Sequence, residues 1–205
     1  MAAVAPGCCR PRARPLVWRE MVDAPYLTGQ LLLAMPGMAD PRFSKAVIAV
    51  CAHNEDGALG VGLGAPMREI RLPELLEKLE LPRGDVPDAP VYRGGPVEPS
   101  RGFVVHSTDW SGQDTVDVAR RFALTGTLDV LKAITEGKGP SRWAVALGYA
   151  GWGSGQLDDE MSMHGWLSLP HDPGILWGPE VGRWDRALSG AGIDPRLLSP
   201  TGGRA

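Results

Sequence analysis

Two histidines, His53 and His106, carry the most versatile side chains of this chain. An imidazole can act as a general base or a metal ligand, and a carboxylate such as Glu160 would complete a metal-binding set. No His-x-x-x-His or similar spacing links them, so the sequence predicts neither a metal site nor a cofactor. A structural role is favoured for both. The ring of His53 can hydrogen-bond the backbone of a hairpin and fix its turn, and His106 fits a buried, hydrogen-bonded imidazole.

Two glycine-rich segments resemble functional motifs, one for dinucleotide binding and one for a serine nucleophile, and the sequence argues against both. Gly60–Gly64 resembles part of the dinucleotide-binding motif G-x-G-x-x-G, but Ala65 takes the sixth position, a proline follows and no helix begins there. Ser154 lies between two glycines, yet Trp152 and Gln156 occupy the glycine positions of the nucleophile motif G-x-S-x-G. Tight turns explain the first segment, and Ser154 is predicted to cap a helix.

The segment from Gly151 to Gln156 is the best candidate for an exposed functional loop. Glycine-rich loops that carry an aromatic residue are common in recognition sites, although a tryptophan there can instead plug the end of a sheet. Arg101 adds a cation that could take part in a cleft. The sequence therefore predicts a ligand or partner surface whose candidate residues are Gly151, Trp152, Gly153, Gln156, Glu160, His53, Arg101 and His106.

Short apolar runs bounded by Gly, Pro, Asn and Asp predict the elements that would position these residues. The expected strands cover 31–35, 46–52, 58–63, 101–107, 143–149 and 166–169, with a hairpin turn at 53–57. A helical turn is expected over 41–45 behind the N-cap Asp40, and helices are expected to begin at Pro73 and Pro179 and directly after the N-caps Thr127 and Ser154. Val181, Trp184 and Leu188 are expected on the apolar face of the last helix.

This element order predicts an α+β fold in a single compact domain. Strands and helices do not alternate steadily and no phosphate loop is present, so a doubly wound nucleotide fold is not indicated. Residues 1–24 mix Arg, Pro and Ala without periodicity and are expected to form a disordered extension. The domain itself is expected to cover 25–205.

Composition limits the function classes. The chain has 205 residues, 43 % of them hydrophobic, and none of its apolar runs approaches the roughly 18 residues that a membrane helix needs. Three cysteines without a framework spacing fit a reducing, cytoplasmic setting. The net charge is −3, and the four arginines that precede Glu20 leave −7 for the rest of the chain, which disfavours direct binding of nucleic acid.

Five blocks, in this order along the chain, resemble the YqgE/AlgH family of bacterial proteins. They are the segments 33–37, 53–60, 94–97, 101–106 and 148–157, with Glu160 and Trp166 after the last of them. The resemblance implies a branched, partly barrel-like mixed β-sheet flanked by helices. It also implies a family without an established enzymatic activity, which carries a label as a transcriptional regulator from a member linked to alginate production.

The chain departs from the family pattern at the end of the third predicted strand. Many members have Asn and a basic residue there before a proline, whereas this chain has Gly64 and Ala65 before Pro66. It also has Ser154 where members often have Pro, and His164 where Asn is common. A ligand or partner contact that uses the amide and the cation would therefore be lost.

Three hypotheses of function follow. The leading one is a cytoplasmic, non-enzymatic regulatory protein that acts through contact with a protein or a small ligand. The alternative is a hydrolase or transferase that uses His53 or His106 with Arg101 in a cleft beside Trp152, which requires these side chains to converge. The third is a homo-oligomer that assembles through a sheet edge or the Trp152 segment.

Overall fold

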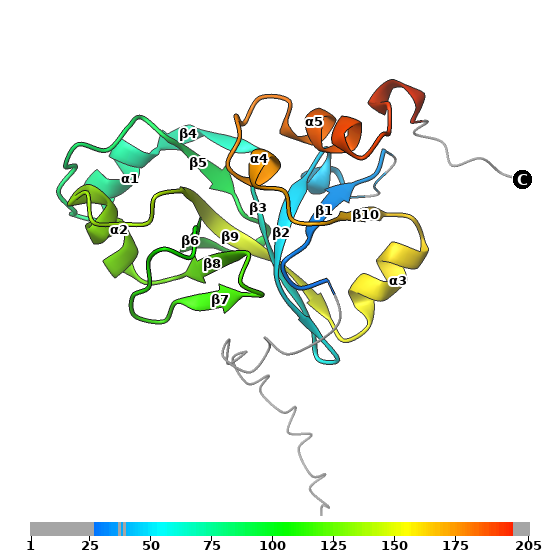
Figure 1. The fold of residues 1–205 in the computed structure, drawn as a ribbon, viewed down its shortest axis with the longest axis horizontal. Coiled ribbons are helices and arrows are strands. Elements are labelled where there is room, and N and C mark those ends of the chain that lie inside the picture. Colours follow the sequence, from blue (N-terminus) through cyan, green and yellow to red (C-terminus); the bar gives the residue numbers. More distant parts are fainter. Residues whose placement is uncertain (1–26, 37, 39, 199–205) are drawn as a thin grey trace, which may run out of the picture.

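The computed structural model describes residues 27–36, 38 and 40–198, and its centre is one branched β-sheet (Figure 1). The disordered extension predicted for 1–24 and the domain start at 25 lie outside the described residues. The strands are β1 (Leu31–Ala34), β2 (Val47–Asn54), β3 (Gly57–Gly62), β4 (Pro66–Arg71), β5 (Pro90–Arg93), β6 (Val97–His106), β7 (Val116–Val118), β8 (Phe122–Thr125), β9 (Trp143–Gly153) and β10 (Trp166–Leu169).

The sheet branches at β9, which pairs with three other strands. Its last residues pair antiparallel with β3, from Gly57 opposite Gly153 to Gly60 opposite Ala150, and its middle pairs parallel with β5. Along most of its length β9 also pairs antiparallel with β6. The strand order is β10-β1-β2-β3-β9-β6-β8-β7, with β4 attached through β5. The branched, curled sheet that the family resemblance implied is confirmed.

Helices cover the sheet in three places. In Figure 1, α1 and α2 lie together at the left end, α3 lies beside β10 at the right, and α4 and α5 lie above β1 and β2. They and two short 3-10 turns have the bounds η2 (Pro41–Phe43), α1 (Leu72–Lys78), α2 (Leu128–Thr135), α3 (Gln156–Ser162), α4 (Pro173–Leu176), α5 (Arg183–Gly190) and η3 (Pro195–Leu197). No helix in the described ranges is both long and apolar enough to cross a membrane.

Each group of helices closes its own apolar core, and the alternation of strand side chains distributes residues among the cores. On β6, Phe103 and Val105 face the core beneath α4 and α5, whereas Val104 faces the core beneath α1 and α2. The third core, which includes Trp152 and Trp166, lies against α3. The α+β single-domain prediction is confirmed, because these cores share the strands of one sheet.

The last helix starts later than predicted. Proline at 179 suggested a helix opening there, but α5 begins at Arg183 behind Gly182, whose φ of +68° is accessible to glycine at little cost. Val181 therefore precedes the helix and is 81 % exposed, instead of lying on its apolar face as predicted. Trp184 and Leu188 are buried as expected.

The other differences concern short or weakly patterned segments. The strands β4, β5, β7 and β8 and the one-turn helix α4 were not predicted, and β9 runs four residues beyond the expected end at Tyr149. The N-cap of α3 is Gly155 and not Ser154, whose hydroxyl instead donates to the carbonyl of Glu55 in the β2–β3 hairpin.

Candidate functional site

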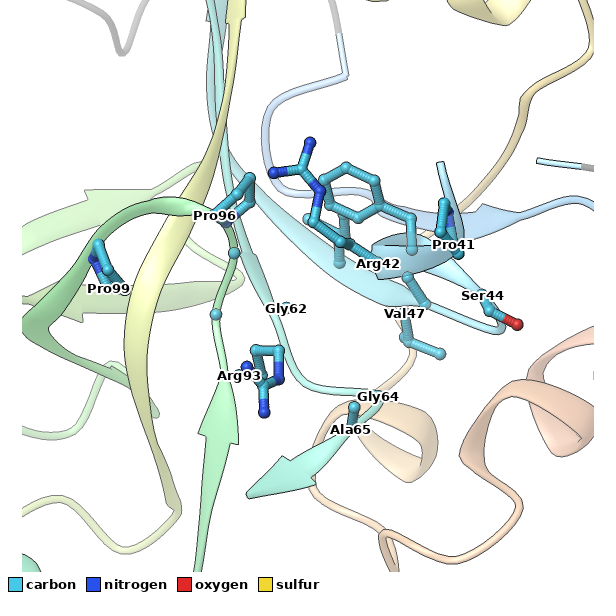
Figure 2. A pocket seen from close by; sticks show the side chains of 15 residues that line it. Pro41, Arg42, Ser44, Val47, Gly62, Gly64, Ala65, Arg93, Pro96 and Pro99 are labelled. Atoms are coloured by element: carbon cyan, nitrogen blue, oxygen red, sulfur yellow. The ribbon is translucent and has the colours of Figure 1, made fainter. Parts of the chain in front are cut away.

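A pocket of about 460 Å³ opens between three segments that are distant in sequence. They are residues 41–48, which include η2 and the start of β2, residues 62–65 at the end of β3, and residues 93–99 between β5 and β6 (Figure 2). Pockets that hold small ligands have volumes of roughly 300–1,000 Å³. The size of this pocket therefore suits a small molecule.

Glycine residues allow two of these segments to meet. The amide of Gly62 donates to the carbonyl of Gly94 at 2.7 Å, and a Cβ added to Gly62 would lie 2.7 Å from the carbonyl oxygen of Arg93. Gly94 in turn donates to the carbonyl of Leu147 on β9 at 2.8 Å. Close backbone contact thus fixes the position of Arg93 and of the turn that follows it.

The third wall is a helical turn whose geometry follows from its first residues. As predicted, Asp40 caps η2 by accepting the backbone N–H of Arg42 at 3.0 Å, with Pro41 at the first helical position. The Arg42 side chain also binds this carboxylate, with Nε 3.0 Å from both oxygens. These contacts hold the pKa of Asp40 below its usual value. The turn brings Phe43 to the wall of the pocket.

The lining combines an apolar surface with two cations. Phe43, Val47 and Ile48 contribute apolar side chains to the lining. Figure 2 shows Pro96 and Pro99 on the side opposite Val47. The charged side chains are those of Arg42 and Arg93. Among the lining residues, all of which the structure describes, there is no His, Cys, Asp or Glu. The pocket can bind an apolar or anionic group, but its own side chains offer no general base.

The strand end at which the chain departs from the family pattern forms part of this pocket. Gly64 and Ala65 both line it, so an amide and a cation at these positions would lie at the pocket. Arg42 and Arg93 were not among the residues predicted from the sequence. The one signal for Arg93 was its position directly before the Gly94–Gly95 pair, and nothing in the sequence places it beside Gly62.

Three of the predicted surface residues, Trp152, Gln156 and Glu160, do come together around one carboxylate. The indole nitrogens of Trp152 and Trp166 donate to the same oxygen of Glu160, at 3.0 and 2.7 Å. The other oxygen accepts from Gln156 Nε2 at 2.8 Å, and Gln156 Oε1 accepts the amide of Gly153 at 3.0 Å. This Glu160 cluster ties α3 to the ends of β9 and β10.

The Glu160 cluster corrects the prediction of an exposed Trp152 loop. Residues 151–153 belong to β9, and Trp152 is only 7 % exposed because its ring packs in the third core against Trp166. Alternation along the strand leaves Gly151 and Gly153 exposed. Trp152 therefore closes the end of the sheet, which was the structural alternative.

His53 fastens the segment before β1 to the end of β2. Its ring is buried, Nδ1 accepts the amide of Leu27 at 3.3 Å, and Nε2 lies 3.7 Å from a carboxylate oxygen of Asp158. Its backbone N–H donates to the hydroxyl of Thr28 at 2.9 Å. His53 has the structural role that was predicted, but the prediction that its ring fixes the hairpin turn is wrong. The side chain of Asn54 fixes that turn instead.

His106 is fully buried and hydrogen-bonded at both ring nitrogens, as the structural interpretation predicted. Nδ1 lies 2.8 Å from the carbonyl oxygen of Ser107, and Nε2 lies 2.9 Å from the hydroxyl of Thr125. Burial lowers the pKa of His106, and it also lowers the pKa of His53 and His171.

These three lowered pKa values predict a pH-dependent stability. The unfolded chain binds each proton near pH 6.5, whereas the folded protein binds it only at lower pH. The free energy of unfolding should therefore be constant between about pH 7 and pH 8 and should fall as the pH drops toward 5. Urea titrations at several pH values measure this, and His106→Gln should reduce the slope. A flat wild-type profile, or a slope that His106→Gln leaves unchanged, would contradict the prediction.

The candidate residues do not form one cleft. Strand register places His106 opposite Trp143 at the start of β9, whereas Gly57 lies opposite Gly153 at its end, roughly 30 Å away at 3.3 Å per residue. His53 lies near the end of β9 that contains Gly153. Arg101 precedes Gly102, which pairs with Leu147 in the middle of β9, and its guanidinium binds Glu98 at 3.0 Å. The structure therefore lacks the arrangement that the hydrolase or transferase hypothesis requires.

One row of aromatic rings connects the pocket with the Glu160 cluster. Phe43 in the pocket wall packs edge to face on Trp166 with centroids 5.4 Å apart, and Trp166 packs in the same way on Trp152 at 5.8 Å. Displacement of Phe43 would therefore change the surroundings of Trp166, which in turn packs on Trp152.

Comparison with known proteins shows similarity across nearly the whole described chain. The profile of the AlgH-like family matches residues 31–196. A UPF0301 protein from Rhizorhabdus wittichii is 59 % identical over 186 residues, which cover 90 % of this chain and all of that protein. A UPF0301 protein from Novosphingobium aromaticivorans is 53 % identical, covering 89 % of this chain and 99 % of the relative.

Solved structures share the fold. The solution structure of the AlgH protein from Pseudomonas aeruginosa has a TM-score of 0.72 and 39 % identity, and the match covers 91 % of this chain and all of that one. A crystal structure of a Corynebacterium diphtheriae protein has a TM-score of 0.68 over 89 % of this chain and 96 % of its own, at 23 % identity. The second likeness shows the fold alone.

Proposed function

The chain belongs to the AlgH-like family, and on that premise we propose that it is a non-enzymatic, cytoplasmic regulatory protein that binds a small ligand in the pocket between η2, the end of β3 and the β5–β6 turn. The observation that carries this proposal is the pocket itself. It has the volume of a small-ligand site, and its walls come from segments whose mutual position is fixed by backbone hydrogen bonds.

The composition of the pocket favours binding over catalysis. General acid–base or nucleophilic catalysis needs a titratable group or activated nucleophile within reach of the substrate. The one hydroxyl in the lining is that of Ser44, and no base stands among the lining residues, which all lie in the described ranges. The buried rings of His53 and His106, elsewhere in the fold, are occupied by structural contacts.

In this proposal the regulatory output is a contact with another protein at the α3 end of the sheet. The row from Phe43 through Trp166 to Trp152 gives the pocket a packed connection to that end. The exposed acids Asp158 and Asp159 on α3 favour a basic partner surface and disfavour nucleic acid. The free, buried Cys51, whose pKa burial raises to about 12, is compatible with a reducing compartment.

Filling the pocket tests the proposal. Ala65 is an exposed lining residue, so Ala65→Trp should place an indole in the cavity and change the free energy of unfolding by less than about 0.5 kcal/mol. A thermal-shift screen of a metabolite library on the wild-type protein should give stabilising hits. These hits should bind at least about tenfold more weakly to Ala65→Trp.

The matched control is Ala191→Trp, at an exposed alanine after α5 that does not line the pocket. It should bind the hits as the wild-type protein does. Hits that bind Ala65→Trp with unchanged affinity, or a screen without hits, would reject the proposed site.

A further inference from the structure

We infer that the ligand of the pocket is a small organic anion, in which a carboxylate or phosphate is attached to a compact apolar body, and that Arg93 binds the anionic group. This inference rests on the proposed function, because it names the ligand class of the same pocket. It follows from the charge balance of the lining and from the shape of its walls.

The lining is cationic although the chain as a whole is acidic. The charged side chains that line the pocket are Arg42 and Arg93, whereas the chain carries a net charge of −3. Arg42 is neutralised by Asp40, its partner in an exposed ion pair. The guanidinium of Arg93 has no hydrogen bond or ion pair with any residue that the structure describes. Arg93 is therefore the uncompensated charge of the site.

The carboxylates on the flanking segments do not pair with Arg93. Asp40 precedes the first wall and binds Arg42, and Glu98 lies in the third segment and binds Arg101 at 3.0 Å. Both carboxylates already have guanidinium partners, so neither is left to neutralise Arg93. A guanidinium presents a planar fork of donors that matches a carboxylate or phosphate with two parallel hydrogen bonds. A ligand anion would supply the missing partner.

The remaining lining residues suit a ligand whose uncharged part is apolar and small. Figure 2 shows Pro96 and Pro99 on one side of the pocket and Pro41 with Val47 on the other, with Gly62 and Arg93 between them. A volume of about 460 Å³ accommodates a ring-sized ligand and excludes a folded macromolecule. The glycines in the floor are explained by backbone packing, so they do not themselves indicate the ligand.

Matched probes separate the contribution of charge from that of the apolar body. Benzoate and phenyl phosphate carry the two anionic groups, and benzyl alcohol is a neutral molecule of similar shape. Titrated into isotopically labelled protein, both anions should shift the amide signals of Gly62, Gly64, Gly94 and Gly95. We expect at least one anion to bind about tenfold more tightly than benzyl alcohol, and added NaCl to weaken this preference.

Arg93→Gln should remove the preference, lowering the affinity for the anions about tenfold and leaving that for benzyl alcohol unchanged. Arg83→Gln is the control, because Arg83 is exposed in the loop before β5 and does not line the pocket. It should behave as the wild-type protein does. The better-bound anion also distinguishes a carboxylate ligand from a phosphate ester.

Each of the other possible outcomes rejects the inference that the ligand is an anion bound by Arg93. Equal binding of anions and benzyl alcohol at the four glycines would overturn the anion inference and leave the proposed binding function standing. Anion binding that persists in Arg93→Gln, or anions that shift signals elsewhere on the protein, would overturn it too. If neither anion binds in the millimolar range, the inference fails, and the library screen with Ala65→Trp decides independently whether the pocket is a ligand site.

Discussion

Gly95→Ala is expected to lower the free energy of unfolding by about 3 kcal/mol, because the added methyl group has no space. A Cβ at this position would lie 2.1 Å from the carbonyl carbon of Tyr149 and 2.3 Å from the backbone nitrogen of Ala150. Both atoms belong to β9, which cannot shift without disturbing its pairing with β6 and β3. Urea unfolding followed by circular dichroism measures the change.

Gly190→Ala is the matched control for this substitution. Gly190 ends α5, and no heavy atom within 4 Å would meet the new methyl group. Since alanine favours a helix over glycine, this variant should be as stable as the wild-type protein or up to about 1 kcal/mol more stable. If Gly95→Ala were equally harmless, the close contact between the β5–β6 turn and β9 would be wrong. The position of the pocket wall would then be wrong as well.

Glu160→Ala is expected to lower the free energy of unfolding by about 2 kcal/mol, since two indole N–H groups would lose one ionised acceptor. The rings of Trp152 and Trp166 are buried, so water replaces the carboxylate poorly. The tryptophan fluorescence of the folded protein should change with the same substitution. Both effects are read in one urea titration that monitors emission.

Two further variants isolate the role of the acceptor in the Glu160 cluster. Asp159→Ala removes a neighbouring exposed carboxylate and should change stability by less than about 0.5 kcal/mol. Glu160→Gln keeps an oxygen acceptor without the charge and should fall between the wild-type protein and Glu160→Ala. Equal stability of Asp159→Ala and Glu160→Ala would show that the indole hydrogen bonds do not stabilise the fold.

The buried strands could be predicted because each is a short apolar run between turn residues. The run Val47–Ala52 on β2 and the run Phe103–Val105 on β6 are of this kind, and both lie in the core. The strand β4 escaped prediction because its exposed Arg68 and Glu69 leave no alternating pattern. The end of β9 was taken for a loop since Gly151 and Gly153 flank Trp152, and pairing with β3 overrides that local preference.

The site was less predictable than the fold for a physical reason. The Glu160 cluster joins residues close in sequence, so Trp152, Gln156 and Glu160 could be selected together, although their exposure was misjudged. The pocket depends on the contact of Gly62 with Gly94, between strands that are not neighbours in sequence. A single sequence does not encode that contact in any local pattern. Arg93 therefore looked like an ordinary residue at the end of a strand.

The branching of the sheet at β9 has a consequence for how such a protein can diversify. β9 supplies residues to all three cores, yet none of the residues that line the pocket belongs to it. Substitutions at Ala65 or Arg93 can thus alter the pocket lining while the shared strand stays as it is. On the proposed function, the sheet and the pocket lining can therefore change independently, so a single fold of this kind can serve proteins that bind different molecules.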